Sequence, residues 1–200
     1  MADFFMKYLL TFIILISATG GNAMAEDNNT QKATFAAGCF WCLEKPFDDV
    51  EGVLKTISGY TGGEEKNPTY QEVSSGKTGH TEAMQVTYNP EKVSYEKLLD
   101  IFWHNVDPFD AKGQFCDRGS QYRPGIFVHN EAQKKAAEES KKQVEEELGK
   151  KTVVPIEDYT AFYPAEDYHQ NYYKENPLRY KFYRFSCGRD NRLKEIWDKH

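Results

Sequence analysis

The chain is organised around Gly38-Cys39-Phe40-Trp41-Cys42-Leu43-Glu44, which follows the short apolar run 33–37. A strand that runs into a glycine turn and then a helix would place Cys39 at the start of that helix. The free N–H groups and the dipole of a helix N-terminus favour negative charge, and such a position lowers the pKa of a thiol. We therefore expect Cys39 to ionise near neutral pH, beside an aromatic wall made by Phe40 and Trp41.

Strand-like runs alternate with helical patterns along the rest of the chain. Apolar or alternating runs predict strands at 33–37, 53–60, 81–88, 125–129 and 152–156. Capping residues and apolar spacing predict helices at 94–104 and 130–149, the second of them solvated on most of its surface. Pro46 either kinks the helix after Cys39 or begins a new one, and 107–123 is predicted to be a long functional loop. These elements predict the α+β class, as a two-layer α/β sandwich.

The strand 81–88 carries a carboxyl group on its apolar side. Period two places Glu82 on the same face as Met84, Val86 and Tyr88. A carboxyl among apolar groups loses hydration in its charged form, which raises its pKa and suits it to donate a proton. The alternative is that Glu82 lies at a solvated end of the strand, and the periodicity does not separate the two.

The first 25 residues have the pattern of a secretory signal. Lys7 precedes the apolar run 8–16, and Ala23-Met24-Ala25 provides small residues for a signal peptidase. Asp3 counts against this interpretation, and the alternative is an uncleaved membrane anchor, but the run is far shorter than the roughly 20 residues of a spanning helix. We therefore expect residues 1–25 to be removed, and 26–200 to form a single domain that is exported to the periplasm without stable membrane association.

The charge and the cysteine pattern limit the classes of function that the chain could have. The net charge is −6, and no Lys/Arg stripe is interleaved with aromatic residues, so a nucleic-acid partner is not expected. The cysteines are Cys39, Cys42, Cys116 and Cys187, an even number that allows two structural disulfides in an oxidising compartment. A disulfide-stapled binding module and a C-x-x-C thiol–disulfide oxidoreductase of the periplasm are therefore alternatives. A zinc site is not expected, because Cys116 and Cys187 are far apart in sequence.

Five blocks of sequence resemble one family in the same order. They are the Gly38–Glu44 stretch, Ser58-Gly59-Tyr60-Thr61-Gly62-Gly63, Gly79-His80-Thr81-Glu82, Asp117-Arg118-Gly119-Ser120-Gln121-Tyr122-Arg123 and Ala165-Glu166-Asp167-Tyr168-His169-Gln170. Together they resemble the A-type peptide methionine sulfoxide reductases, although many members have glycine in place of Cys42. The resemblance implies a ferredoxin-like mixed-sheet core with long coiled segments, including the C-terminal tail.

The resemblance also implies an activity and a set of roles. The activity is reduction of methionine S-sulfoxide, free or in oxidised proteins, with no bound cofactor or metal and with a thioredoxin-like protein as external thiol reductant. Cys39 would be the nucleophile and Glu82 the acid, a second thiol would clear the sulfenic acid, and we expect a monomer. The other implied site residues are Tyr70 and Tyr122 for the sulfoxide oxygen, Asp117 for polarising the site, and Phe40 and Trp41 for the S-methyl group. The candidates for the resolving thiol, in order of preference, are Cys187, Cys116 and Cys42.

Overall fold

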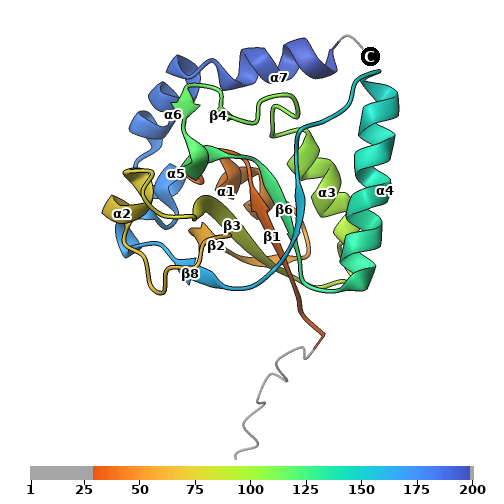
Figure 1. The fold of residues 1–200 in the computed structure, drawn as a ribbon, viewed down its shortest axis with the longest axis horizontal. Coiled ribbons are helices and arrows are strands. Elements are labelled where there is room, and N and C mark those ends of the chain that lie inside the picture. Colours follow the sequence, from red (N-terminus) through yellow and green to blue (C-terminus); the bar gives the residue numbers. More distant parts are fainter. Residues whose placement is uncertain (1–28, 199–200) are drawn as a thin grey trace, which may run out of the picture.

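A β-α-β-β-α-β unit forms the centre of the structure, a computed structural model that describes residues 29–198 (Figure 1). Its elements are β1 (Gln31–Ala36), α1 (Trp41–Asp48), β2 (Val53–Thr61), β3 (Thr81–Tyr88), α3 (Tyr95–Trp103) and β6 (Gly125–Val128). The strands lie in the order β6-β1-β3-β2 and all of these pairs are antiparallel. This is the ferredoxin-like arrangement, so the expected fold class is confirmed.

Two short strands complete a mixed six-stranded sheet. β7 (Ile156–Asp158) pairs in parallel with β6, and β8 (Phe162–Pro164) pairs antiparallel with β2. The long helix α4 (Glu131–Glu147) packs beside α3 and contacts β6. It buries only Gln133, Ala137 and Val144, so the prediction of a mostly solvated helix is confirmed.

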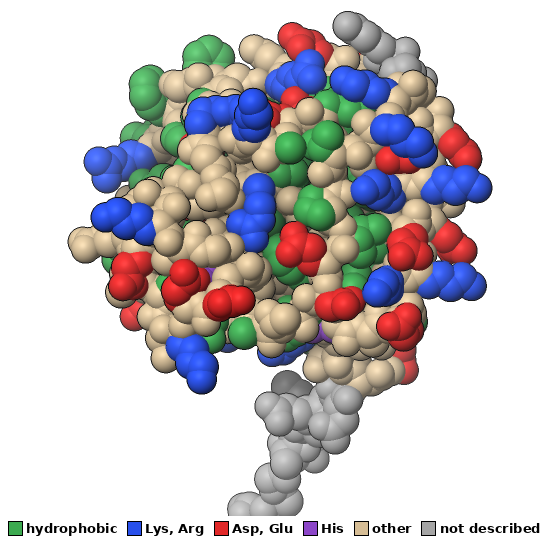
Figure 2. All heavy atoms as spheres, viewed as in Figure 1, with side chains coloured by type: hydrophobic (Ala, Val, Ile, Leu, Met, Phe, Trp, Pro, Cys, Tyr) green, Lys and Arg blue, Asp and Glu red, His purple; other side chains and the backbone are tan. Residues whose placement is uncertain are grey.

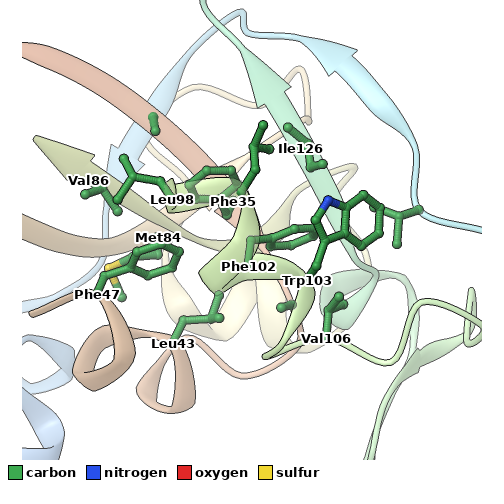
Figure 3. Packing of buried hydrophobic residues seen from close by; sticks show 14 of the residues in the cluster. Phe35, Leu43, Phe47, Met84, Val86, Leu98, Phe102, Trp103, Val106 and Ile126 are labelled. Atoms are coloured by element: carbon green, nitrogen blue, oxygen red, sulfur yellow. The ribbon is translucent and has the colours of Figure 1, made fainter. Parts of the chain in front are cut away.

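The main core lies between the sheet and helices α1 and α3 (Figure 3). Phe35 of β1 stacks on Phe47 of α1 and on Phe102 of α3, with ring centroids 5.3 Å apart in both pairs. Leu43 and Phe47 are four residues apart, and so are Leu98 and Phe102, so each helix turns one apolar side to the sheet. Truncating a buried phenylalanine to alanine typically costs about 3–5 kcal/mol, so this cluster is a main source of the stability that holds α1 in place.

Local sequence signals determine the helix ends. Ser94 caps α3 by accepting a hydrogen bond from the backbone N–H of Lys97, and His104 follows its last residue, as predicted. α1 runs from Trp41 to Asp48 with Pro46 inside it, so the helix does not restart at the proline.

Three irregular regions differ in part from the prediction. The loop 107–123 contains a small hairpin of β4 (Gly113–Gln114) and β5 (Asp117–Arg118), followed by the 3-10 helix η1 (Ser120–Tyr122). The strand predicted at 152–156 begins only at Ile156. Its pairing with β6 starts there, where Ile156 lies opposite Ile126. The tail expected to be coiled is helical and forms α5 (Tyr172–Glu175), α6 (Pro177–Ser186) and α7 (Arg189–Trp197). Its helices form because Tyr180, Leu193 and Ile196 are buried against the domain, a tertiary effect that local sequence does not show.

Predictions about the leader lie outside the described residues, because the description begins at residue 29. Within 29–198, every helix is too short or too polar to cross a membrane. On the face shown in Figure 2, Lys and Arg side chains are interspersed with Asp and Glu. The absence of a nucleic-acid partner stays a prediction.

Candidate active site

A small cavity opens beside the start of α1. Its volume is ≈ 160 Å³, and it is lined by Cys39, Phe40, Trp41, Tyr70, Glu82, Asp117, Tyr122 and Tyr183. The first seven are the nucleophile, acid, polar and methyl-binding residues that the sequence predicted, and the structure brings all of them together. Tyr183 of α6 is the lining residue that sequence reasoning missed.

The turn before α1 presents Cys39 to the cavity. Gly38 has φ 79°, a conformation that favours glycine, and a Cβ there would lie 2.6 Å from the side chain of Gln114. Cys39 is only 6% exposed and comes directly before Phe40, the N-cap of α1. The predicted strand–glycine–helix geometry is therefore present.

Glu82 lies on the buried side of β3. It is 2% exposed, and its Oε2 accepts a hydrogen bond from the backbone N–H of Phe40 at 3.1 Å. The alternative of a solvated strand end is therefore wrong. Burial raises the pKa of Glu82 to about 8, even though the hydrogen bond from Phe40 acts in the opposite direction. Its carboxyl group is thus protonated at neutral pH and can donate a proton.

The expected ionisation of Cys39 is wrong for this structure. Burial raises the pKa of the Cys39 thiol well above its ordinary value, and the nearby Glu82 raises it further. A hydrogen bond from Tyr183 acts in the opposite direction but is the smaller influence. The helix N-terminus is outweighed because a thiolate without solvent loses more hydration energy than the end of one short helix returns. Cys39 therefore rests as a neutral thiol.

Tyr70 and Tyr122 provide phenol groups on the cavity wall. Burial raises the pKa of Tyr70 to about 12 and also raises the pKa of Tyr122, so both remain neutral hydrogen-bond donors. The backbone N–H of Tyr70 donates to Glu166 at 2.8 Å, and its ring centroid lies 4.3 Å from that of His169. Two residues of the 165–170 block thus position Tyr70.

Asp117 and Tyr183 form a second polar contact at the cavity. The Tyr183 hydroxyl lies 2.6 Å from both carboxylate oxygens of Asp117. Burial raises the pKa of Asp117, whereas this contact lowers it. Asp117 is therefore a partly buried residue of the cavity, and not the solvated residue that its polar sequence surroundings alone would suggest. The i, i+3 pair Tyr180–Tyr183 in a helical pattern was the available signal for Tyr183.

The 165–170 block contacts both the aromatic wall of the cavity and strand β2. Trp41 Nε1 donates to His169 Nδ1 at 3.1 Å, and the Trp41 ring stacks on Tyr172 with centroids 3.7 Å apart. Gln170 accepts from the backbone N–H of Ser58 and donates to its carbonyl, each at 2.9 Å. Sequence reasoning used this block only as a family signature, and its role is to hold the aromatic wall against the sheet.

The four cysteines fall into two pairs. Cys116 and Cys187 form a disulfide, and Cys39 and Cys42 are free buried thiols. Ligand atoms of Cys116, Asp117 and Cys187 lie within 4.8 Å of one another, the one cluster among the described residues that could hold a metal ion. Both sulfurs of this cluster are already used in the disulfide, which leaves one carboxylate as a ligand.

A thiol, a protonated carboxyl and two phenols around a small aromatic cavity define a class of protein: a thiol-based reductase for a small apolar group that carries a basic oxygen. Comparisons with known proteins point to the same class. The family model described as peptide methionine sulfoxide reductase matches residues 31–200, and the chain belongs to this family.

Relatives of the A type share about half of their residues with this chain. The peptide methionine sulfoxide reductase MsrA of Bacillus licheniformis is 52% identical over 169 residues, which are 84% of this chain and 93% of the relative. The enzyme of the same name from Bacillus velezensis is 54% identical over 167 residues, 82% of this chain and 94% of the relative.

Solved structures are similar over about three quarters of the chain. Reduced Mxr1 from Saccharomyces cerevisiae has a TM-score of 0.72 and 33% identity, covering 76% of this chain and 89% of that one. Methionine sulfoxide reductase A of Corynebacterium diphtheriae has a TM-score of 0.68 and 30% identity, covering 76% and 78%.

The raised pKa of Glu82 makes stability depend on pH. Because the folded pKa of about 8 is above the ordinary value of 4.5, the folded state resists ionisation, and stability falls as pH rises between these values. Glu82→Gln removes this loss. We expect the variant to gain urea resistance relative to the native chain near pH 9 but not near pH 5. Glu138→Gln, an exposed change on α4, is the control. An equal effect of Glu82→Gln at both pH values would contradict the raised pKa.

Proposed function

We propose that this chain reduces methionine S-sulfoxide to methionine, both as the free amino acid and within oxidised proteins. One observation carries the proposal: the neutral thiol of Cys39, the protonated Glu82 and the phenols of Tyr70 and Tyr122 share one cavity of ≈ 160 Å³. The family match and the names of the relatives support the same chemistry. The C-x-x-C oxidoreductase alternative is not favoured, since the match covers residues 31–200 with a different family.

The cavity has an aromatic side and a side with hydrogen-bond donors, and each binds a different part of the substrate. The S-methyl group packs against Phe40 and Trp41, whose rings are held by Tyr60 and Tyr172. The sulfoxide oxygen carries partial negative charge and accepts hydrogen bonds from Tyr70, Tyr122 and the carboxyl of Glu82. Neutral donors in a site with little water bind such an oxygen without a charge to desolvate.

The first chemical step moves oxygen from substrate to enzyme. The Cys39 sulfur attacks the sulfoxide sulfur while Glu82 gives its proton to the oxygen. Glu82 then takes the proton that Cys39 loses, so no net charge enters the buried site. The S–O bond of the substrate breaks, the hydroxyl group ends on Cys39 as sulfenic acid, and methionine leaves as the thioether.

The second step restores the thiol. A second cysteine attacks the sulfenic acid, releases water and forms a disulfide, which an external thioredoxin-like dithiol then reduces. A solved complex of yeast Mxr1 with Trx2, with a TM-score of 0.53 to this chain, supports such a partner. We also propose that the enzyme acts as a monomer.

Cys39→Ser tests the nucleophile. We expect no methionine from methionine S-sulfoxide with dithiothreitol as reductant, because serine is too weak a nucleophile for the sulfoxide sulfur. The assay is methionine release, with Glu138→Gln as a folded control. Turnover by the serine variant would rule out the assignment.

Glu82→Gln tests the acid. An amide cannot donate its proton as an acid, so kcat should fall by roughly 10²–10⁴, the usual contribution of general acid catalysis. The rate of methionine release should also lose its decline at high pH, where the native carboxyl ionises. An unchanged kcat would remove Glu82 from this role.

We infer from the leader that the protein is exported and repairs oxidised proteins outside the cytoplasm. Lys7, the apolar run 8–16 and the small residues before Glu26 carry this proposal. We expect the protein recovered from the periplasm of an expressing bacterium to begin at Glu26. Full-length protein confined to the cytoplasm would contradict it.

A further inference from the structure

Two arginines of the C-terminal helices donate to backbone carbonyl groups in α1 and in the segments beside it. Arg184 Nη1 of α6 donates to the carbonyl oxygen of Cys42 at 3.2 Å. Arg189 Nη2, at the start of α7, donates to the carbonyl oxygens of Ala37 at 2.8 Å and Asn105 at 2.7 Å. The mechanism above uses neither guanidinium group.

Arg189 is a buried cation that forms no ion pair among the described residues, although its charge lowers the pKa of the nearby Asp117. It is 1% exposed, and its Nε lacks a hydrogen-bond partner among the described residues. Its guanidinium stacks on the ring of Phe115 at 4.3 Å. Burying a charge that is not neutralised is costly. The side chain is therefore suited to meet a negative charge that forms only during the reaction.

Cys42 is the nearby group on which such a charge can form. It is a free thiol, 1% exposed. Burial raises its pKa, whereas Arg189 first and then Arg184 lower it. The titratable and charged groups that face it are Cys39 from the preceding turn, Asp117 from β5, Tyr180, Tyr183 and Arg184 from α6, and Arg189 and Asp190 from α7. Of these, the two arginines are the cations.

The backbone brings Cys42 within disulfide range of Cys39. The N–H of Cys42 donates to the carbonyl of Cys39 at 3.1 Å, which closes a one-turn loop. A turn of this kind holds its end Cα atoms within about 7 Å, and disulfides span about 4.4–6.8 Å between Cα atoms. Helical side chains lean toward the N-terminus, so the Cys42 side chain leans toward the turn that contains Cys39.

We infer that Cys42 is the resolving thiol, and that Arg189 is a positioning residue that holds the Cys42 thiolate for its attack on oxidised Cys39. This inference rests on the proposed function. It reverses the order of preference drawn from the sequence, in which Cys187 and Cys116 came first. Those two are already joined to each other beside Asp117, where they fasten α6 to the β4–β5 hairpin.

The proposed step balances. Cys42 loses its proton, its sulfur attacks the sulfur of Cys39 sulfenic acid, and an S–S bond replaces the S–O bond. Cys42 is oxidised and the sulfenic sulfur is reduced. The departing hydroxide takes a proton from Glu82 and leaves as water, and the proton that Cys42 lost returns Glu82 to its protonated state. The thioredoxin-like dithiol then reduces the Cys39–Cys42 disulfide.

Mass mapping after a single turnover tests the resolving thiol. The full chain is treated with one equivalent of methionine S-sulfoxide without reductant, and its disulfides are identified after cleavage between Phe40 and Trp41. We expect a Cys39–Cys42 disulfide, which should also form in the double variant Cys116→Ser/Cys187→Ser. In Cys42→Ser, we expect one equivalent of methionine, a Cys39 sulfenic acid that dimedone traps, and loss of turnover with thioredoxin.

The outcomes separate this inference from the proposed function. A disulfide between Cys39 and Cys116 or Cys187, or a trapped sulfenic acid in the double variant, would overturn the resolving role of Cys42 while methionine is still released. No methionine from the native chain would overturn the proposed function, and the inference with it.

The role of Arg189 is tested through the pH dependence of disulfide formation. In Arg189→Met, we expect the curve of rate against pH to move to higher pH, because the Cys42 thiolate loses the cation that lowers its pKa most. The rate near neutral pH should then fall roughly tenfold for every pH unit by which the curve moves. Arg189→Lys should restore part of the rate because it keeps the charge. Arg179→Met, an exposed change on α6, is the control. A curve in Arg189→Met that matches the native one would remove Arg189 from this role.

Discussion

The hydrogen bond from the Phe40 N–H to Glu82 Oε2 is the contact on which the site depends, because it joins the start of α1 to the start of β3 inside the protein. The sheet makes it unavoidable. β1 and β3 are antiparallel neighbours with Phe35 opposite Met84, so the end of β1 and the beginning of β3 meet at one edge. The turn at Gly38 then leads the chain directly over Glu82. Cys39 and Glu82, the proposed nucleophile and acid, are 43 positions apart in sequence and are thus brought together by the register of a single strand pair.

The same burial that builds the site also keeps it neutral. Cys39, Glu82, Tyr70 and Tyr122 all have raised pKa values, and desolvation is the leading cause in each case. A site of this kind does not store a reactive thiolate. In the proposed mechanism, Glu82 and the two phenols keep their protons beside the place where the sulfoxide oxygen arrives, and Cys39 loses its proton only as that oxygen is protonated. Coupling the two proton movements avoids a net charge in a dry cavity, which would be costly.

How much of this the sequence predicted depended on how local the cause was. The bounds of β3 and the caps of α3 follow from alternation and from Ser94, and the structure has them where they were expected. The buried state of Glu82 was open because periodicity reports a face and not its depth. The ionisation of Cys39 was wrong because a helix terminus is visible in sequence, whereas the atoms that remove water from the thiol come from distant segments. The helical tail, Tyr183 and Arg189 were missed for the same reason.

The C-terminal helices are part of the site because α1 alone cannot satisfy its own backbone. Pro46 lacks the N–H that would bond to the carbonyl of Cys42, and Arg184 supplies the missing donor from α6. This hydrogen bond is one of the contacts that hold α6 against α1, together with the packing of Tyr183 on Trp41. Tyr183, one residue earlier, then meets Asp117 in the cavity, and Cys187, one turn later, reaches Cys116. A proline that would only weaken an isolated helix therefore leaves a carbonyl group free for a donor from the tail, and the docked tail places Tyr183 and Arg184 beside the two free thiols.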